Sequence, residues 1–308
     1  MAEKSKEATK RPLIVMIDEL DRCRPTYAIE LLEVAKHLFS VENIVFVLAI
    51  NRSELAHSIQ AIYGDRFDAE GYLRRFFDIE FQLPDPDRGA FIDAMFVSIG
   101  LDSYLQRTQD TNARRHSETV QKMAKTFFGA TDLSIRRISQ AMHRLGLVYA
   151  SLRSDQQSFT IAAVTALILR TIAPGMYHRL ARGEISDADA IGHVFDRPSL
   201  QHIKQQHEGN LFEATIAVGS HEEELYSMTP SELPSSPLLQ RHFAVVENTD
   251  KEVTPKERKQ SQDVIALVER FRSNFFRGSG GIGFAESIRR LELLTNNLID
   301  DSSQHDAE

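Results

Sequence analysis

The 308-residue sequence contains one cysteine, Cys23, and no tryptophan. One cysteine cannot form a disulfide within the chain, so a disulfide-stapled secreted domain is excluded and a reducing compartment is expected. Long apolar runs are also missing: residues 159–169 form the longest nearly apolar stretch, about half of the ~20 residues that a spanning helix needs. Residues 1–12 are polar and lack the apolar core of a signal peptide. The sequence therefore predicts a cytoplasmic protein without a membrane segment.

The composition that remains is ordinary for a globular protein, with 42% hydrophobic and 26% charged residues. The length suggests about two domains. A formal net charge of −8 argues against a protein that coats nucleic acid. One modest basic stretch is typical of a solvated helix face, with nucleic-acid contact as the alternative; it comprises Arg107, Arg114, Arg115, Lys122 and Lys125.

Two apolar runs near the N-terminus predict strands of a parallel sheet. Residues 13–17 (LIVMI) and 44–50 (IVFVLAI) are continuously apolar, which is typical of strands covered on both faces. Helices are predicted over 25–39 and 51–62, and the alternating run DIEFQL at 78–83 predicts a third, edge strand. A strand–helix–strand–helix–strand order favours an α/β fold.

After residue 86 the periodicity becomes helical. Helices are predicted over 87–105, 117–128, 132–152, 159–172, 261–276 and 284–298. Residues 174–260 hold several prolines and polar stretches, and we expect short elements and loops there.

Two carboxylates, Asp18 and Glu19, directly follow the first apolar strand. An apolar strand that ends in such a pair has the Walker B arrangement of P-loop nucleoside triphosphatases. The first acid would hold the Mg²⁺ of Mg-ATP through water, and the second would orient and deprotonate the attacking water. For the short motif alone, a strand that merely ends in acidic residues is an equally good interpretation.

The continuation of this motif resembles a known family. The segments IDELDRCRP, IVFVLAINRSEL and YLRRFFDIEFQLP are similar to the second half of a KAP-family P-loop NTPase, a relative of the STAND and AAA+-like ATPases. The resemblance is close over 11–88 and continues weakly to about Leu152. It implies ATP and Mg²⁺ as cofactors and three regions: the Walker B half of a P-loop NTPase sheet at 1–86, a lid-like helical region at 87–173, and a variable, mainly helical region at 174–308.

The resemblance also implies roles for single residues beside Asp18 and Glu19. Asn51 resembles the polar sensor 1 residue that contacts the γ-phosphate or the attacking water; a helix N-cap is the alternative. Arg74 and Arg75 resemble the arginine-finger region, with a solvated helix end as the alternative. Arg136 resembles the sensor 2 arginine of a helical lid, with an ordinary surface arginine as the alternative.

A phosphate-binding loop, G-x-x-x-x-G-K-[ST], is missing from the 308 residues. Gly278 and Gly283 have its glycine spacing, but Phe284 and Ala285 stand where lysine and serine or threonine belong. The sequence thus predicts the Mg²⁺ and water side of an ATP site without the side that grips the phosphates. The chain would be a fragment of a longer chain, a split subunit whose partner supplies the loop, or a degenerate homologue. We expect either self-association or such a partner chain.

Two functions follow as hypotheses. The first is an ATPase module that works as a conformational switch once a Walker A segment is supplied, with prokaryotic antiviral defence as the setting that the family suggests. The second is a non-catalytic scaffold or regulatory interaction module. On either hypothesis we expect this chain alone not to hydrolyse ATP.

Overall fold

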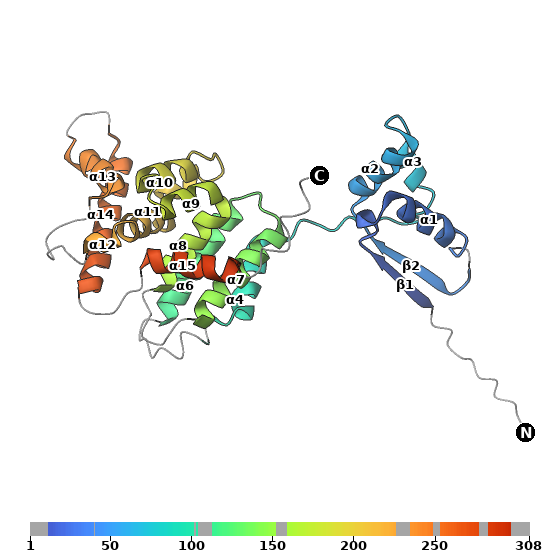
Figure 1. The fold of residues 1–308 in the computed structure, drawn as a ribbon, viewed down its shortest axis with the longest axis horizontal. Coiled ribbons are helices and arrows are strands. Elements are labelled where there is room, and N and C mark those ends of the chain that lie inside the picture. The colour runs from blue at the N-terminus through green and yellow to red at the C-terminus, as the bar shows by residue number, and fades with distance from the viewer. Residues whose placement is uncertain are drawn as a thin grey trace, which may run out of the picture. The chain divides into compact units, whose positions relative to one another are not determined.

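The computed structural model describes residues 12–39, 41–101, 103, 113–151, 159–225, 235–248, 253–276 and 283–296. The chain divides into two compact units, 1–84 and 85–308 (Figure 1). Each unit has a hydrophobic core of its own. The further division that the sequence predicts at residue 173 stays a prediction.

The first unit combines a two-stranded parallel sheet with helices. Its elements are β1 (Leu13–Asp18), the 3-10 helix η1 (Leu20–Arg22), α1 (Pro25–Lys36), β2 (Ile44–Ala49), α2 (Arg52–Tyr63) and α3 (Ala69–Leu73). The strands pair in register from Leu13 opposite Ile44 to Asp18 opposite Ala49. The predicted α/β fold class, a partial P-loop sheet followed by a helical region, is confirmed.

Local sequence explains where these helices begin. Pro25 occupies the first turn of α1, where a missing backbone N–H costs little. The side chain of Asn51 caps α2 by accepting the N–H of Glu54, and that of Asp68 caps α3. Apolar residues of both longer helices then pack on the sheet and form the core of the unit; they include Ile29 and Leu32 of α1 and Leu55 and Ile59 of α2.

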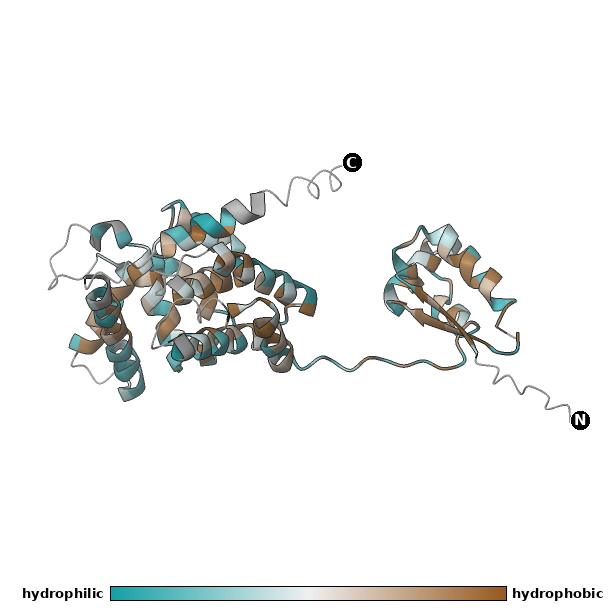
Figure 2. Cartoon of the chain, turned by 90° about the horizontal axis from the view of Figure 1, so that it is seen from below, coloured by the Kyte–Doolittle hydropathy of each residue, from teal (hydrophilic) through white to brown (hydrophobic). Residues whose placement is uncertain are grey.

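Within the first unit, described residues cover only one face of the sheet. Burial alternates along both strands, and every second side chain is exposed. The exposed set, here called the open sheet face, is apolar and comprises Ile14, Met16, Val45 and Val47; both strands are coloured as hydrophobic in Figure 2. The expectation that these strands are covered on both faces is therefore not met by the described residues of the first unit.

The prediction of a third strand at 78–83 is wrong. Within the described residues the sheet consists of β1 and β2 alone, so the run DIEFQL has no neighbour that could supply ladder hydrogen bonds. Its apolar side chains are left in solvent, and Phe81 is 89% exposed. Side chains hold the segment instead, because Arg52 of α2 forms an ion pair with Glu80.

The second unit is helical throughout its described residues. Its elements are α4 (Arg88–Ser98), α6 (Ala113–Gly129), α7 (Ile135–Ser151), α8 (Phe159–Ile172), α9 (Pro174–Ala181), α10 (Asp187–Phe195), the 3-10 helix η2 (Gln201–Gln205), α11 (His207–Gly219), α12 (Glu222–Leu225), α13 (Pro237–Glu247), α14 (Pro255–Phe276) and α15 (Phe284–Asn296). None of the helices within the described ranges is both long and apolar enough to cross a membrane.

Two helices lie at the centre of this unit. α8 and α11 are buried on nearly all sides, and α8 packs against α6, α7, α9 and α15 (Figure 1). Helices on either side of residue 173 thus share one core. The short elements predicted over 174–260 are confirmed for α9, α10, η2 and α12, which span four to nine residues. The prediction is wrong for α11 and α13, which are longer regular helices.

Candidate functional site

Parallel pairing brings the predicted site residues to one edge of the sheet. Asp18 lies opposite Ala49, and Asn51 follows two residues later. The N–H of Glu19 donates to the carbonyl of Ala49 at 3.2 Å, which extends the ladder one residue beyond β1. Asp18, Glu19 and Asn51 therefore meet where both strands end, the edge at which ligands of α/β sheets bind.

Asp18 presents a carboxylate with one committed oxygen. Its Oδ1 accepts the N–H of Glu19 at 2.8 Å. No other partner of this carboxylate is found within the described residues, so Oδ2 faces solvent. Asp18 also belongs to the exposed set of side chains along β1. Such an oxygen suits a water-mediated contact with a magnesium ion.

Glu19 has an unusual backbone conformation. Its φ of 56° and ψ of 30° place it in the left-handed region, which costs a residue with a Cβ roughly 1–2 kcal/mol and is often found at functional sites. Its carboxylate pairs with Arg22 at 2.9 Å, and both side chains are about half exposed. Exposed pairs contribute only about 0–1 kcal/mol, so this carboxylate can be redirected at little cost.

A third carboxylate, Asp21, has a different task. Its Oδ1 accepts the backbone N–H of Asn51 at 3.0 Å, which fastens the turn after β1 to the end of β2. The side-chain oxygen of Asn51 caps α2, so the N-cap role is present and the amide Nδ2 remains able to donate. Sequence reasoning left Asp21 without this role, because nothing local connects it to a residue so far along the chain.

Arg74 and Arg75 directly follow α3 and are exposed. Arg74 lies 4.0 Å from Asp68, and about two thirds of its side chain is open to solvent. An arginine finger acts on the site of a neighbouring molecule. Within the described residues, neither arginine forms an ion pair with Asp18 or Glu19. The arginine-finger role stays a prediction.

Arg136 lies in α7 of the second unit, and its side chain is exposed. Its neighbour Arg137 is held by its own unit: the N–H of Arg137 donates to Ser134 Oγ and its guanidinium to the carbonyl of Thr171. The sensor 2 role of Arg136 stays a prediction.

The carboxylates at the sheet edge suit magnesium better than a metal ion whose ligands all come from protein side chains. Within the described ranges no group of three or more His, Cys, Asp or Glu side chains could hold a metal ion. Mg²⁺ does not need one, because it keeps several waters and takes one or two protein carboxylates together with phosphate oxygens. Asp18 at the sheet edge is a ligand of that kind.

A glycine is required at position 283 for a structural reason that does not involve phosphate binding. Residues 278–282 lie outside the described part of the chain, but Gly283 leads into α15. A Cβ on Gly283 would lie 1.6 Å from Glu222 Oε2, and the backbone N–H groups of Gly283 and Ala285 donate to Glu222. A carboxylate of the chain therefore occupies the helix end where a phosphate would bind, which agrees with rejecting this segment as a phosphate loop.

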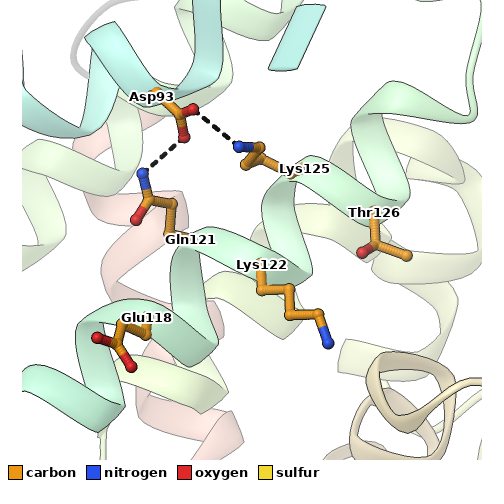
Figure 3. A pocket seen from close by; sticks show the side chains of 6 residues that line it. All are labelled: Asp93, Glu118, Gln121, Lys122, Lys125 and Thr126. Carbon is orange, nitrogen blue, oxygen red and sulfur yellow. Dashed lines mark hydrogen bonds and ion pairs between the residues drawn. The ribbon is translucent and has the colours of Figure 1, made fainter. Parts of the chain in front are cut away.

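An open depression on the second unit is lined by polar side chains, several of which bond to one another or to nearby residues of the chain (Figure 3). Asp93 accepts Lys125 Nζ at 2.8 Å and Gln121 Nε2 at 2.6 Å, and these bonds hold the pKa of Asp93 below its usual value. Lys122 pairs with the buried Glu208 at 2.7 Å. Two members of the predicted basic stretch are thus engaged by carboxylates of their own chain.

One hydrogen-bonded row of side chains was not predicted from the sequence; it comprises Ser261, His242 and Glu213. His242 Nε2 lies 2.8 Å from Glu213 Oε2, and His242 Nδ1 lies 3.0 Å from Ser261 Oγ. All three residues are buried, so a substrate cannot reach the serine. The row therefore joins α11, α13 and α14 and does not constitute a hydrolytic triad.

A parallel strand pair with acidic residues at its carboxyl edge is characteristic of nucleotide-binding P-loop domains. Residues 1–152 match the KAP family P-loop domain, which confirms the resemblance that the motifs within 11–88 predict. The match identifies a nucleotide-binding, NTPase-like module. Comparison with curated proteins and with solved structures gave no match.

Proposed function

We propose that the first unit supplies the magnesium- and water-binding half of an ATP site, and that a phosphate-binding loop from another polypeptide segment completes it. Asp18 would hold Mg²⁺ through water, Glu19 would act as the general base, and the amide of Asn51 would contact the γ-phosphate or the attacking water. Bound ATP would supply the phosphate oxygens that complete the magnesium coordination.

The observation that carries this proposal is the alignment of the two strand ends. Because β1 and β2 run parallel and in register, Asp18 and Asn51 lie at the same edge, and Asp21 fixes the backbone of Asn51 there. An unrelated acidic strand end would not need a bond from its own turn to the neighbouring strand. The solvent-facing Oδ2 of Asp18 adds a ligand atom at that edge.

The open sheet face supports the idea of a second segment. Sheets of this parallel type are covered on both faces, and an exposed strand edge invites pairing. A segment that carries the phosphate loop would bury Met16, which is 77% exposed, and its neighbours. Its source would be an upstream segment or a partner chain, since these 308 residues contain no such loop.

Hydrolysis in such a divided site would act as a conformational switch. ATP would bridge the two segments through its phosphates, and loss of the γ-phosphate would weaken that bridge. The weak pair between Glu19 and Arg22 fits this picture, since the arrival of a second segment would need only a small free energy to redirect Glu19.

The test is ATP turnover by the purified full chain and by complexes recovered with it. We expect no turnover by the chain alone and turnover by the complex. Asp18→Asn and Glu19→Gln should each abolish that turnover, and Glu30→Gln serves as the matched control because Glu30 is an exposed carboxylate of α1.

Two results would overturn the assignment. Robust turnover by the chain alone that Glu19→Gln abolishes would show that no second segment is needed. Unchanged turnover of the complex with Asp18→Asn would remove Asp18 from the magnesium site. A complex that binds but never hydrolyses ATP would favour the scaffold hypothesis.

A role in prokaryotic antiviral defence rests on the family resemblance alone. If the switch acts in defence, phages should form fewer plaques on bacteria that carry the gene together with its neighbouring genes than on bacteria in which the same gene encodes Asp18→Asn. Equal plaque counts across a broad phage panel would remove this role and leave the ATP site untouched.

A further inference from the structure

One histidine of the second unit lies between carboxylates of two different helices. His221 Nε2 is 3.6 Å from Asp187 Oδ2, and His221 Nδ1 is 2.9 Å from Glu224 Oε1. The side chain of Asp187 is fully buried, and that of His221 is 19% exposed. The ring therefore joins the first residue of α10 to α12.

The two carboxylates also hold the start of α13. Asp187 accepts the hydroxyl of Ser236 and, at 3.2 Å, the N–H of Leu238. Glu224 Oε2 accepts the N–H of Ser235 at 2.9 Å. We call His221, Asp187 and Glu224 the histidine clasp. It connects three elements that are separate in the sequence.

The protonation state of the ring decides whether both contacts are favourable. A neutral imidazole has one N–H and one lone pair, whereas the imidazolium has two N–H donors. In the clasp both ring nitrogens face carboxylate oxygens, so a neutral ring must turn a lone pair toward one of them. Only the imidazolium satisfies Asp187 and Glu224 together.

The electrostatics agree with this geometry. The contact with the Asp187 carboxylate raises the pKa of His221, against the opposing effect of burial. Burial opposes ionisation of Asp187, but the contact with His221 and the hydrogen bond from Ser236 hold the pKa of Asp187 below its usual value. The bond from the N–H of Ser235 and the contact with His221 lower the pKa of Glu224.

We propose that the histidine clasp is a proton-operated switch that fastens α12 and the start of α13 to α10 when His221 is doubly protonated and releases one of its two contacts when His221 is neutral. Asp187 of α10 and Glu224 of α12 are the charged groups that face the ring within the described residues. The start of α13 contributes Ser235 and Ser236, which carry no charge. The side chain of Asp187 is fully buried and would lose a donor without gaining water, whereas that of Glu224 is 38% exposed and can be hydrated. The contact with Glu224 is therefore the one that opens.

The experiment is an NMR titration of the full chain. Ring nitrogen shifts of His221 report its protonation, and hydrogen exchange of the Ser235 amide reports the Glu224 contact. We expect the exchange rate of that amide, corrected for its intrinsic pH dependence, to rise at least about threefold between roughly pH 5.5 and 8.5. Glu224→Gln should lower the titration midpoint of His221 and remove the pH dependence of the Ser235 rate.

A matched control is His193→Gln, because His193 is an exposed histidine of α10 itself; it should leave both readouts unchanged. His221→Gln should give a Ser235 exchange rate independent of pH. If that variant fails to fold, the Glu224→Gln titration still decides. An unchanged His221 midpoint in Glu224→Gln, or a corrected Ser235 rate that does not vary with pH in the unmodified chain, would overturn the proposal.

Discussion

The backbone N–H of Asn51 donates to Asp21 Oδ1 at 3.0 Å, across 30 residues of sequence. This bond sorts the three carboxylates that follow β1. Asp21 is committed to holding the neighbouring strand end, Glu19 is paired weakly with Arg22, and Asp18 retains a free oxygen. A catalytic role is therefore best sought in Asp18 and Glu19.

Asp21→Ala should loosen the sheet edge. The alanine cannot accept the Asn51 N–H. A hydrogen bond to a charged group contributes about 1.5–3 kcal/mol, and because this bond is exposed we expect a loss of about 1 kcal/mol. The measurement is urea unfolding followed at amide signals of β1 and β2. Asp21→Asn keeps an acceptor oxygen and should recover most of the loss. Equal losses for the two variants would contradict the assigned bond.

Two glycine-to-alanine substitutions should change stability in opposite directions. A Cβ at Gly209 would lie 2.1 Å from the carbonyl oxygen of Ile203, whereas a Cβ at Gly192, inside α10, meets nothing within 4 Å. Gly209→Ala should cost about 1–3 kcal/mol through overpacking. Gly192→Ala should add roughly 0.5–1 kcal/mol, since it removes the entropy cost of a helical glycine. Thermal unfolding of both variants checks the pair, and a common sign would refute it.

The buried pair of Glu213 and His242 should show strong coupling. Removing one member of a buried hydrogen-bonded pair typically costs about 3–5 kcal/mol because its partner is left without compensation. Glu213→Leu and His242→Leu should therefore each be severe, and the double variant should be milder than the sum by roughly 0.5–3 kcal/mol. A double-mutant cycle by urea unfolding gives this coupling free energy. Additive losses would mean that the two side chains act independently.

Glu222 should make the protein less stable as pH rises. Burial raises the pKa of Glu222 above its ordinary value of 4.5. The folded chain then binds this proton more tightly than the unfolded chain does, so the stabilisation is complete below pH 4.5 and is lost as pH rises through the raised pKa. Glu222→Gln keeps an acceptor oxygen and should melt higher than the unmodified chain at neutral pH, with little difference near pH 4. Glu247→Gln, at an exposed position of α13, is the control; a pH-independent difference for Glu222→Gln would refute the prediction.

The elements that the sequence predicts correctly are those fixed by local pattern. The apolar runs at 13–17 and 44–50 became β1 and β2, and α8 matches its predicted span of 159–172. The strand at 78–83 failed because pairing depends on a neighbour and not on the alternation itself. The longer helices α11 and α13 were missed because prolines and polar stretches within 174–260 were taken as breaks. Pro174, Pro237 and Pro255 instead begin α9, α13 and α14, where the first turn tolerates them.

The same distinction between local pattern and distant contacts applies to the candidate site. Asp18, Glu19 and Asn51 could be placed at one edge because parallel strands align their carboxyl ends. The acceptor role of Asp21 and the clasp around His221 depend on contacts between distant segments, which no local pattern contains. The roles assigned to Arg74, Arg75 and Arg136 depend on partners outside their own units, so the fold of each unit cannot reveal them.

The open sheet face carries a chemical reporter. Met16, at its centre, is 77% exposed, and an exposed thioether is readily oxidised to the sulfoxide. Limited peroxide treatment followed by peptide mass spectrometry would therefore report the state of this face. Met16 should be oxidised quickly in the chain alone and slowly whenever a second segment lies over the strands. The buried Met142 of α7 provides an internal standard, so occupancy of the sheet could be followed without knowing in advance what covers it.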